Sequence, residues 1–274
     1  MKSALQVPRT LPEESEVLPG VRNAIAVASA KGGVGKSTVS INLALSLART
    51  GARVGLLDAD IYGPSIPLMM GVREQPELTE DDKMVPVNRC GIDLMSIGFV
   101  TGEDTPVIWR GPLLAQALQH FINQVEWGEL DYLLIDLPPG TGDIPLTLSQ
   151  TIALSGAVMV TTPQGVALED VERGIAMFET VDVDLLGVVE NMSYYICPEC
   201  GERHEVFAHG GGREAARRLE LDFLGEIPLH AGIRAGGDSG KPVAFAEPDS
   251  PEGRVFATIA DRVAAAIQSM ADEE

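Results

Sequence analysis

Short runs of apolar residues recur along the chain and alternate with stretches that have helical spacing. The apolar runs cover residues 21–28, 53–58, 92–97, 131–136, 157–162, 185–190 and 223–227. Continuous runs of this length are typical of strands that are buried on both faces of a parallel sheet. Helices are expected over residues 37–49, 113–125, 168–178, 213–219 and 251–270. This alternation predicts an α/β fold, with a mostly parallel, doubly wound sheet and helices on both of its faces.

The segments outside these runs indicate how the chain is divided and where its loops lie. Residues 1–20 combine three prolines with three glutamates and show no apolar period, so we expect an extended, flexible leader. Residues 21–271 then form one domain, which is a common size for a single α/β unit. Residues 72–88 are polar and contain two prolines, which predicts a surface excursion. Ser250, Pro251 and Glu252 have the residue types of a helix start, so the last helix is expected to begin there.

A glycine-rich segment joins the first strand to the first helix. Its glycines tolerate positive φ angles and can turn backbone N–H groups toward a phosphate. Lys36 then supplies a charge for the β/γ-phosphates, and the hydroxyl of Ser37 is a ligand for Mg²⁺. Ala30 stands where the usual phosphate-binding pattern has glycine. The predicted nucleotide-binding residues of this P-loop are Gly32, Gly33, Val34, Gly35, Lys36, Ser37 and Thr38.

Acidic residues follow two of the other predicted strands. Asp58 and Asp60 lie at the end of one, and Asp136 ends another. Ligands bind at the carboxyl ends of parallel strands, so we expect these carboxylates to face the phosphate cradle, with Asp136 holding Mg²⁺. Turn or helix-capping aspartates are the alternative. Asn191 follows the sixth strand, and its amide offers a donor and an acceptor for a purine edge; a plain turn asparagine is the alternative.

The charge balance restricts the partners. Twenty basic and forty acidic residues give a net charge of −20, which repels phosphate backbones and anionic lipid headgroups. We therefore expect no binding to nucleic acid or membranes. No run of 18 apolar residues and no apolar signal core is visible in the sequence, so a cytoplasmic location is expected.

Three cysteines are too few for a disulfide framework, and two of them form a C-x-x-C pair at Cys197 and Cys200. The pair lies in an insertion near residues 192–210. Three interpretations compete: a zinc site completed by His204 and His209, a thioredoxin-like redox pair, or half of a cluster site that two chains share. The late position in the chain does not fit the redox motif. Cys90 has no local partner and is interpreted as structural.

Together these motifs resemble the Mrp/ApbC-type iron–sulfur cluster carriers, a branch of the MinD/ParA-like ATPases with a deviant P-loop. The resemblance runs from about Leu18 to Ile267. The segments that carry it are residues 30–38, 58–67, 136–143, 190–193, 197–200 and 236–242. The second of these and the cysteine pair separate cluster carriers from cell-division and partition ATPases.

The resemblance implies a single P-loop ATPase domain that hydrolyses ATP slowly with Mg²⁺. Lys31 would reach the nucleotide of the other subunit in a homodimer, and Asp60 would orient the attacking water. Ser37, Asp58 and Asp136 would surround Mg²⁺. Cys197 and Cys200 of two subunits would together bind one [4Fe–4S] cluster, for transfer to apo iron–sulfur proteins. The glycine-rich residues 232–240 are expected to cover the base.

Two other functions are compatible with a P-loop of this type. A MinD/ParA-like positioning switch would bind a surface as an ATP-driven dimer, but the charge of −20 and the acidic last helix do not provide a surface-binding feature. A P-loop ligase or kinase of small molecules would need an acceptor pocket and has no use for the C-x-x-C pair.

Overall fold

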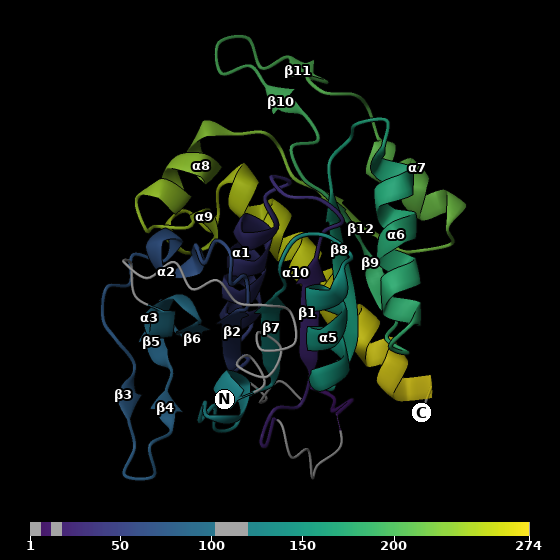
Figure 1. Cartoon of the computed structure of the whole chain (residues 1–274). Coiled ribbons are helices and arrows are strands. Elements are labelled where there is room, and N and C mark those ends of the chain that lie inside the picture. Colours follow the sequence, from purple (N-terminus) through teal and green to yellow (C-terminus); the bar gives the residue numbers. More distant parts are fainter. Residues whose placement is uncertain (1–6, 12–17, 102–119, 274) are drawn as a thin grey trace.

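A parallel sheet forms the centre of the protein (Figure 1). The computed structural model describes residues 7–11, 18–101 and 120–273. Within these residues, eight strands follow the order β12-β9-β8-β1-β7-β2-β6-β5, and all neighbours are parallel except β5 and β6. The strands are β1 (Ala24–Ala28), β2 (Val54–Asp58), β5 (Val87–Arg89), β6 (Ile92–Ser96), β7 (Tyr132–Asp136), β8 (Gly156–Thr161), β9 (Leu185–Glu190) and β12 (Phe223–Glu226). The predicted mostly parallel sheet is confirmed.

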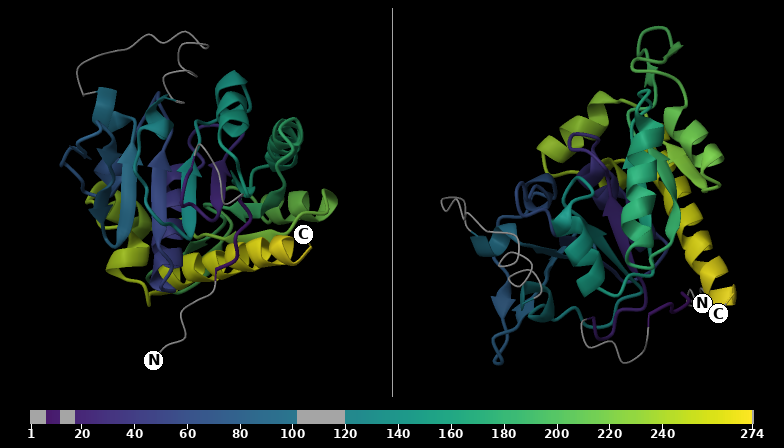
Figure 2. Two further views of the ribbon diagram at one scale, coloured as in Figure 1. Left: turned by 90° about the horizontal axis from the view of Figure 1, so that it is seen from below. Right: turned by 45° about the vertical axis from the view of Figure 1, so that its right-hand side comes forward.

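Helices cover both faces of this sheet. One face carries α1 (Lys36–Arg49), α9 (Val243–Ala246) and α10 (Pro251–Glu273), and the other carries α5 (Asp143–Thr151), α6 (Ala167–Glu179) and α7 (Gly211–Arg218). Figure 2 shows α10 lying along one face, with α5 and α6 on the opposite one. The doubly wound arrangement that the sequence predicts is therefore present.

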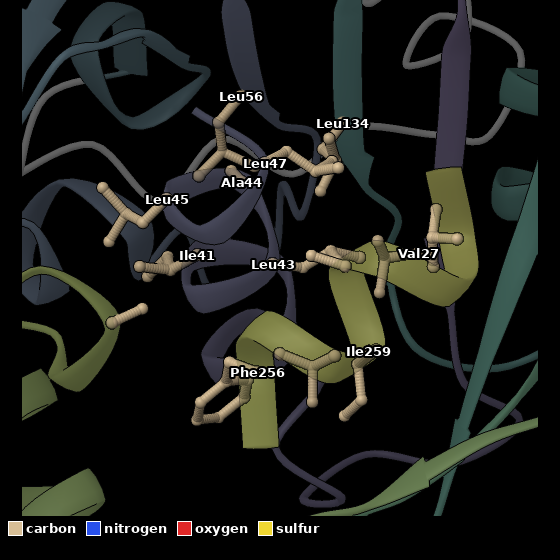
Figure 3. Packing of buried hydrophobic residues seen from close by; sticks show 14 of the residues in the cluster. Val27, Ile41, Leu43, Ala44, Leu45, Leu47, Leu56, Leu134, Phe256 and Ile259 are labelled. Carbon is tan, nitrogen blue, oxygen red and sulfur yellow. The ribbon is translucent and has the colours of Figure 1, made fainter. Parts of the chain in front are cut away.

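The two faces explain why the strands are apolar at every position. In β1, Ile25 and Val27 pack into the layer of α1 and α10, whereas Ala24 and Ala26 pack toward the other layer. Figure 3 shows Val27, Leu43 of α1 and Ile259 of α10 in the first layer. All three side chains are fully buried or nearly so. Each such burial stabilises the fold by about 1.5–3 kcal/mol, which holds α1 in place behind the P-loop.

Two segments differ from the simplest expectation. Most of the glycine-rich residues 232–240 lie in a helix, α8 (Ala231–Asp238). Nδ1 of His230, the residue before this helix, accepts a hydrogen bond from the N–H of Gly232 at 3.2 Å. This helix packs on α2 (Ile66–Met69), and Gly237 allows the close approach of Met69. Tertiary packing thus outweighs the low helix propensity of glycine.

Part of the predicted leader lies against the domain. Asn23 donates through Nδ2 to the carbonyl of Pro8 at 2.7 Å and accepts from the N–H of Thr10 at 3.1 Å. Val7 and Leu11 are buried. These contacts fix the described residues 7–11 to the body, and the rest of residues 1–17 lies outside the described part.

Shorter elements complete the fold. Residues 72–88 include the small hairpin of β3 (Glu77–Leu78) and β4 (Met84–Val85), and α3 covers Gly98–Thr101. The helix expected over residues 113–125 lies mostly outside the described part of the chain. Within its described residues, 120–125, residues 120–123 are helical. No helix of the described part is both long and apolar enough to cross a bilayer.

A projecting hairpin and an arginine contact mark the end and one edge of the sheet. The hairpin of β10 (Tyr195–Ile196) and β11 (Arg203–His204) projects beyond the carboxyl ends of the strands, at the same end of the molecule as the β1–α1 loop (Figure 1). At one edge of the sheet, Nη1 of Arg262 in α10 donates to the carbonyls of Phe223 and Leu224 in β12, at 3.2 and 2.9 Å.

Candidate functional site

The loop between β1 and α1 forms an open cradle. A Cβ atom on Gly32 or Gly33 would meet no described atom within 4 Å, and Gly33 has a φ of +80°. Gly35, with a φ of +81°, comes directly before the first residue of α1. The loop can therefore present backbone N–H groups to an anion together with the positive end of the helix dipole.

Behind the cradle, the predicted phosphate and metal residues contact one another. Nζ of Lys36 lies 2.8 Å from Oδ2 of Asp136 and 4.0 Å from Oδ2 of Asp60. Ser37 and Ser40 donate through their hydroxyls to the two oxygens of Asp136, each at 2.6 Å. The buried carboxylate of Asp136 is thus held by two hydroxyl donors and one ion pair, and the structure brings Lys36, Ser37, Asp60 and Asp136 together.

Asp58 lies beside Asp136 in the adjacent strand. It accepts hydrogen bonds from the hydroxyl of Ser96 at 2.9 Å and from the N–H of Ile66 at 3.2 Å. Complete burial, and then the negative charge of Asp136, raise the pKa of Asp58 to about 7. Asp58 is therefore poised to change charge when a cation arrives.

Asp60 presents an unused acceptor to the cradle. Burial raises the pKa of Asp60, and the charge of Lys36 opposes that shift. Its buried Oδ1 has no hydrogen-bond partner among the described residues. A buried carboxylate oxygen needs a polar partner, so water or a cation fits there. Carboxylate and hydroxyl oxygens are the ligand types that Mg²⁺ prefers, and Ser37 and Asp136 offer both types in contact with each other beside the cradle.

Asn191 joins the end of β9 to the P-loop. Its Nδ2 donates to the carbonyl of Val34 at 2.8 Å, and the side chain is buried. A Cβ on Gly35 would lie 2.2 Å from the same nitrogen, so glycine is needed for this approach. The amide nitrogen is thus used by the loop itself, while a role in reading a purine stays a prediction.

Lys31 is held within its own chain. Its Nζ lies 2.9 Å from Oδ2 of Asp170 in α6 and 3.3 Å from Oε1 of Gln164. The Asp170 side chain is nearly buried, whereas that of Lys31 is about one-third exposed. The predicted reach into another subunit therefore requires this ion pair to open.

The C-x-x-C pair lies in the turn of the projecting hairpin. Cys197 donates its N–H to the carbonyl of Glu202 at 2.9 Å and accepts from the N–H of Gly201 at 2.8 Å. Backbone N–H groups of Cys200 and Glu199, and then the Cys200 thiol, lower the pKa of Cys197. A lowered thiol pKa favours the thiolate, which is the form that binds metal. All three cysteines are free, and Cys200 is exposed.

The two histidines near the pair contact glutamates. Nδ1 of His209 lies 3.1 Å from Glu205, and Nε2 of His204 lies 3.9 Å from Glu202. Among the described residues, no group of three or more His, Cys, Asp or Glu side chains is arranged to hold a metal ion. One chain of this structure therefore does not assemble the Cys₂His₂ alternative.

Sequence reasoning missed three residues of this site. Ser40 lies one turn along α1 from Lys36, on the face toward Asp136. Ser96 ends β6 beside Asp58, and Asp170 lies on α6 opposite Lys31. The strand-end rule could have suggested Ser96, but the sequence carries no signal for the contacts of Ser40 and Asp170.

Comparison with known protein families and sequences identifies relatives of this chain. Residues 20–264 match the family described as ParA, NUBPL iron-transfer P-loop NTPase. The chain is 48% identical over 259 residues to the iron-sulfur cluster transfer protein NUBPL of Dictyostelium discoideum. This alignment covers 94% of this chain and 80% of that protein. It is 49% identical over 245 residues to the iron-sulfur cluster carrier protein of Pseudomonas fragi, covering 89% and 85%.

Solved structures show the same architecture. A nucleotide-binding protein of Archaeoglobus fulgidus, in complex with ADP, aligns with a TM-score of 0.75 and 42% identity, over 86% of this chain and 92% of that one. The cell-division ATPase MinD of Pyrococcus furiosus aligns with a TM-score of 0.65 over 88% and 98%. Its identity of 21% makes that second likeness one of fold.

Proposed function

The chain belongs to the ParA family of NUBPL-type iron-transfer P-loop NTPases, and from this premise we propose that it is a Mg²⁺-dependent ATPase that carries iron–sulfur clusters. Two copies would bind one [4Fe–4S] cluster between them and deliver it to apo iron–sulfur proteins. The observation that carries the proposal is the placement of a two-thiol hairpin at the same end of the molecule as the P-loop.

The residues suggest how ATP is handled. The P-loop N–H groups bind the phosphates, and Lys36 turns from Asp136 toward them, where its charge stabilises the developing negative charge. Asp60 offers its free oxygen to the attacking water. Ser37, Asp58 and Asp136 would hold Mg²⁺, which when bound neutralises charge on the phosphate oxygens.

The ligand count supports a shared cluster. A [4Fe–4S] cluster takes four thiolates, and each chain offers two in one hairpin. Since Cys200 is exposed and the hairpin projects from the body, a second copy can bring its own pair to the same point. The homodimer and the recipient proteins belong to this proposal, because the family and its named relatives concern iron–sulfur transfer.

Anaerobic reconstitution tests the cargo. We expect about four irons per two chains, with loss of iron in Cys197→Ala and Cys200→Ala. Cys90→Ala is the matched control, because Cys90 lies in the turn between β5 and β6 and should leave iron binding unchanged. One tightly bound zinc per chain, dependent on His204, would refute a shared cluster.

ATP turnover is tested separately. Lys36→Ala should abolish hydrolysis, because the γ-phosphate loses its charge partner. Undiminished turnover in this variant would exclude the proposed site. A positioning switch is the alternative function; it would bind and hydrolyse ATP as well, but would not need the thiols for its activity.

A further inference from the structure

The cysteine hairpin is attached to the body through its base. Its strands contain two residues each, so few hydrogen bonds within the hairpin hold it. Arg203, three residues after Cys200, forms a two-pronged contact with Glu226 at the end of β12, with distances of 3.1 and 3.4 Å. The same guanidinium stacks 3.9 Å above the ring of Tyr194. Arg203 therefore fixes the direction in which the hairpin leaves the sheet.

Below this contact, one serine lies between two carboxylates. The hydroxyl of Ser193 lies 2.5 Å from Oε1 of Glu190 and 3.3 Å from Oε2 of Glu226. A hydroxyl has one hydrogen to donate, so the two glutamates compete for it. Glu190 is completely buried and also accepts from the N–H of Gly212 at the start of α7. A change in the position of Glu190 therefore alters whether the hydroxyl of Ser193 donates its hydrogen bond to Glu190 or to Glu226.

The same turn contacts the P-loop. Residues 190–193 begin at the last residue of β9, and within them Asn191 donates through Nδ2 to the carbonyl of Val34 at 2.8 Å. Met192 has a φ of +56°, which costs a non-glycine residue roughly 1 kcal/mol or more. Backbone hydrogen bonds between Ser193 and Ile227 and between Ile227 and Glu190 hold the turn, at 2.9 and 2.8 Å. One strained, hydrogen-bonded turn therefore contacts the P-loop at one end and the hairpin base at the other.

We propose that the turn 190–193, with Glu226 and Arg203 as positioning residues, couples the nucleotide state of the P-loop to the orientation of the cysteine hairpin. A phosphate in the cradle repositions the P-loop backbone, including the carbonyl of Val34. Asn191 follows that carbonyl, and the shared hydroxyl of Ser193 passes the change to the Glu226–Arg203 contact. The inference rests on the proposed function for the purpose of the thiols, but not for the coupling itself.

The test measures thiol reactivity without any cluster. Reduced, iron-free protein in a Cys90→Ser background is alkylated with and without a non-hydrolysable ATP analogue and Mg²⁺. We expect the rate at Cys197 and Cys200 to change about fivefold or more with the nucleotide, which is the lower range of coupling between sites. Arg203→Lys and Glu226→Gln should reduce that change to less than about twofold, because each removes the two-pronged contact but keeps a similar shape.

A matched control separates coupling from a general effect on the hairpin. Arg203 also donates through Nε to Glu205 at 2.8 Å, a contact within the hairpin segment that does not involve Glu226. Glu205→Gln should keep the full nucleotide response. Circular dichroism and analogue binding in the range of the wild type would show that the two test variants are folded. A response that survives in both Arg203→Lys and Glu226→Gln would overturn the proposal.

Dilution distinguishes coupling within one chain from cover by a second copy. The response should persist after dilution to concentrations at which the protein is monomeric, since every contact in the path lies within one chain. A wild-type protein without a nucleotide response, or one whose response disappears on dilution, would overturn the inference. Failure of the protein to bind iron would instead refute the proposed cargo and leave this measurement unaffected.

Discussion

At the scale of single residues, the contacts of Lys31 bear directly on the proposed dimer. The ion pair with Asp170 holds this lysine at its own subunit, so reaching a neighbouring nucleotide must replace it. The pair is part-exposed, and pairs of this kind contribute about 1 kcal/mol. Asp170 therefore opposes dimerisation in proportion to the strength of this contact.

Weakening this contact should favour the dimer. Asp170→Asn is expected to tighten dimerisation with Mg²⁺ and a non-hydrolysable ATP analogue roughly 30-fold, because one such pair of ~1 kcal/mol opens in each of the two subunits. Sedimentation velocity measures it. Glu169→Gln is the matched control, because Glu169 pairs with Arg173 on the same helix. Unchanged dimerisation in Asp170→Asn, or normal dimerisation in Lys31→Ala, would contradict the prediction.

Asp58 should make the stability of the nucleotide-free protein depend on pH. Its pKa rises from an ordinary value of 3.8 to about 7 in the folded state. Between these pH values the folded chain binds a proton that the unfolded chain releases, so the contribution of Asp58 to stability falls as pH rises. In Asp58→Asn this loss should be absent, giving a smaller fall in the thermal midpoint between pH 5 and pH 8 than in the wild type. Equal falls in both proteins, measured with a chelator present, would show that Asp58 is not protonated in the fold.

Most of the nucleotide site could be predicted because its residues obey a positional rule. Lys36, Asp58 and Asp136 lie where a parallel sheet gathers the ends of its strands, and that rule needs only the order of strands and turns. The contact of Ser40 could not be predicted, since a serine in a helix has the same local sequence whether or not a carboxylate faces it. The contact of Asn191 with Val34 depends on which loops the folded sheet brings together.

At the scale of elements, the last helix shows how a short signal sets a boundary. Ser250 stands before Pro251, the first residue of α10, and its hydroxyl accepts from the N–H of Gly253 at 3.0 Å. The start of this helix was therefore predictable from three residues. Helix α8 was not, because its glycines gain helical structure from packing on α2 rather than from their own propensity.

Removing this cap should weaken the fold by a known amount. Ser250→Ala is expected to lower the free energy of unfolding by ~1 kcal/mol, because one N–H at the helix start loses its acceptor. Denaturant unfolding measures the change. Thr258→Ala is the control within α10: its exposed hydroxyl donates to the carbonyl of Arg254, which the helix already uses, so a smaller effect is expected. A loss in the control as large as in Ser250→Ala would argue against capping as the cause.

At the scale of the whole molecule, the charge of −20 opposes the association of two copies. Salt screens this repulsion, since the Debye length falls from about 10 Å at 0.1 M to about 3 Å at 1 M. We therefore expect the nucleotide-bound dimer to tighten severalfold over that range of sodium chloride, as seen by sedimentation. Dissociation at high salt would instead mean that opposite charges at the interface dominate.

The expected cytoplasmic location stays a prediction.

The contact of Arg262 with β12 has a consequence for how this protein behaves when it is crowded. A bare edge strand is a template on which another chain can add a strand, and growth from such an edge ends in fibrils or precipitate. A guanidinium bonded to the carbonyls of Phe223 and Leu224 occupies acceptors there and leaves a charge beside them. Arg262→Ala should therefore scatter light at protein concentrations where the wild type stays clear, even if its thermal midpoint is nearly unchanged. Arg262 is therefore expected to contribute more to resistance against aggregation than to the stability of the fold.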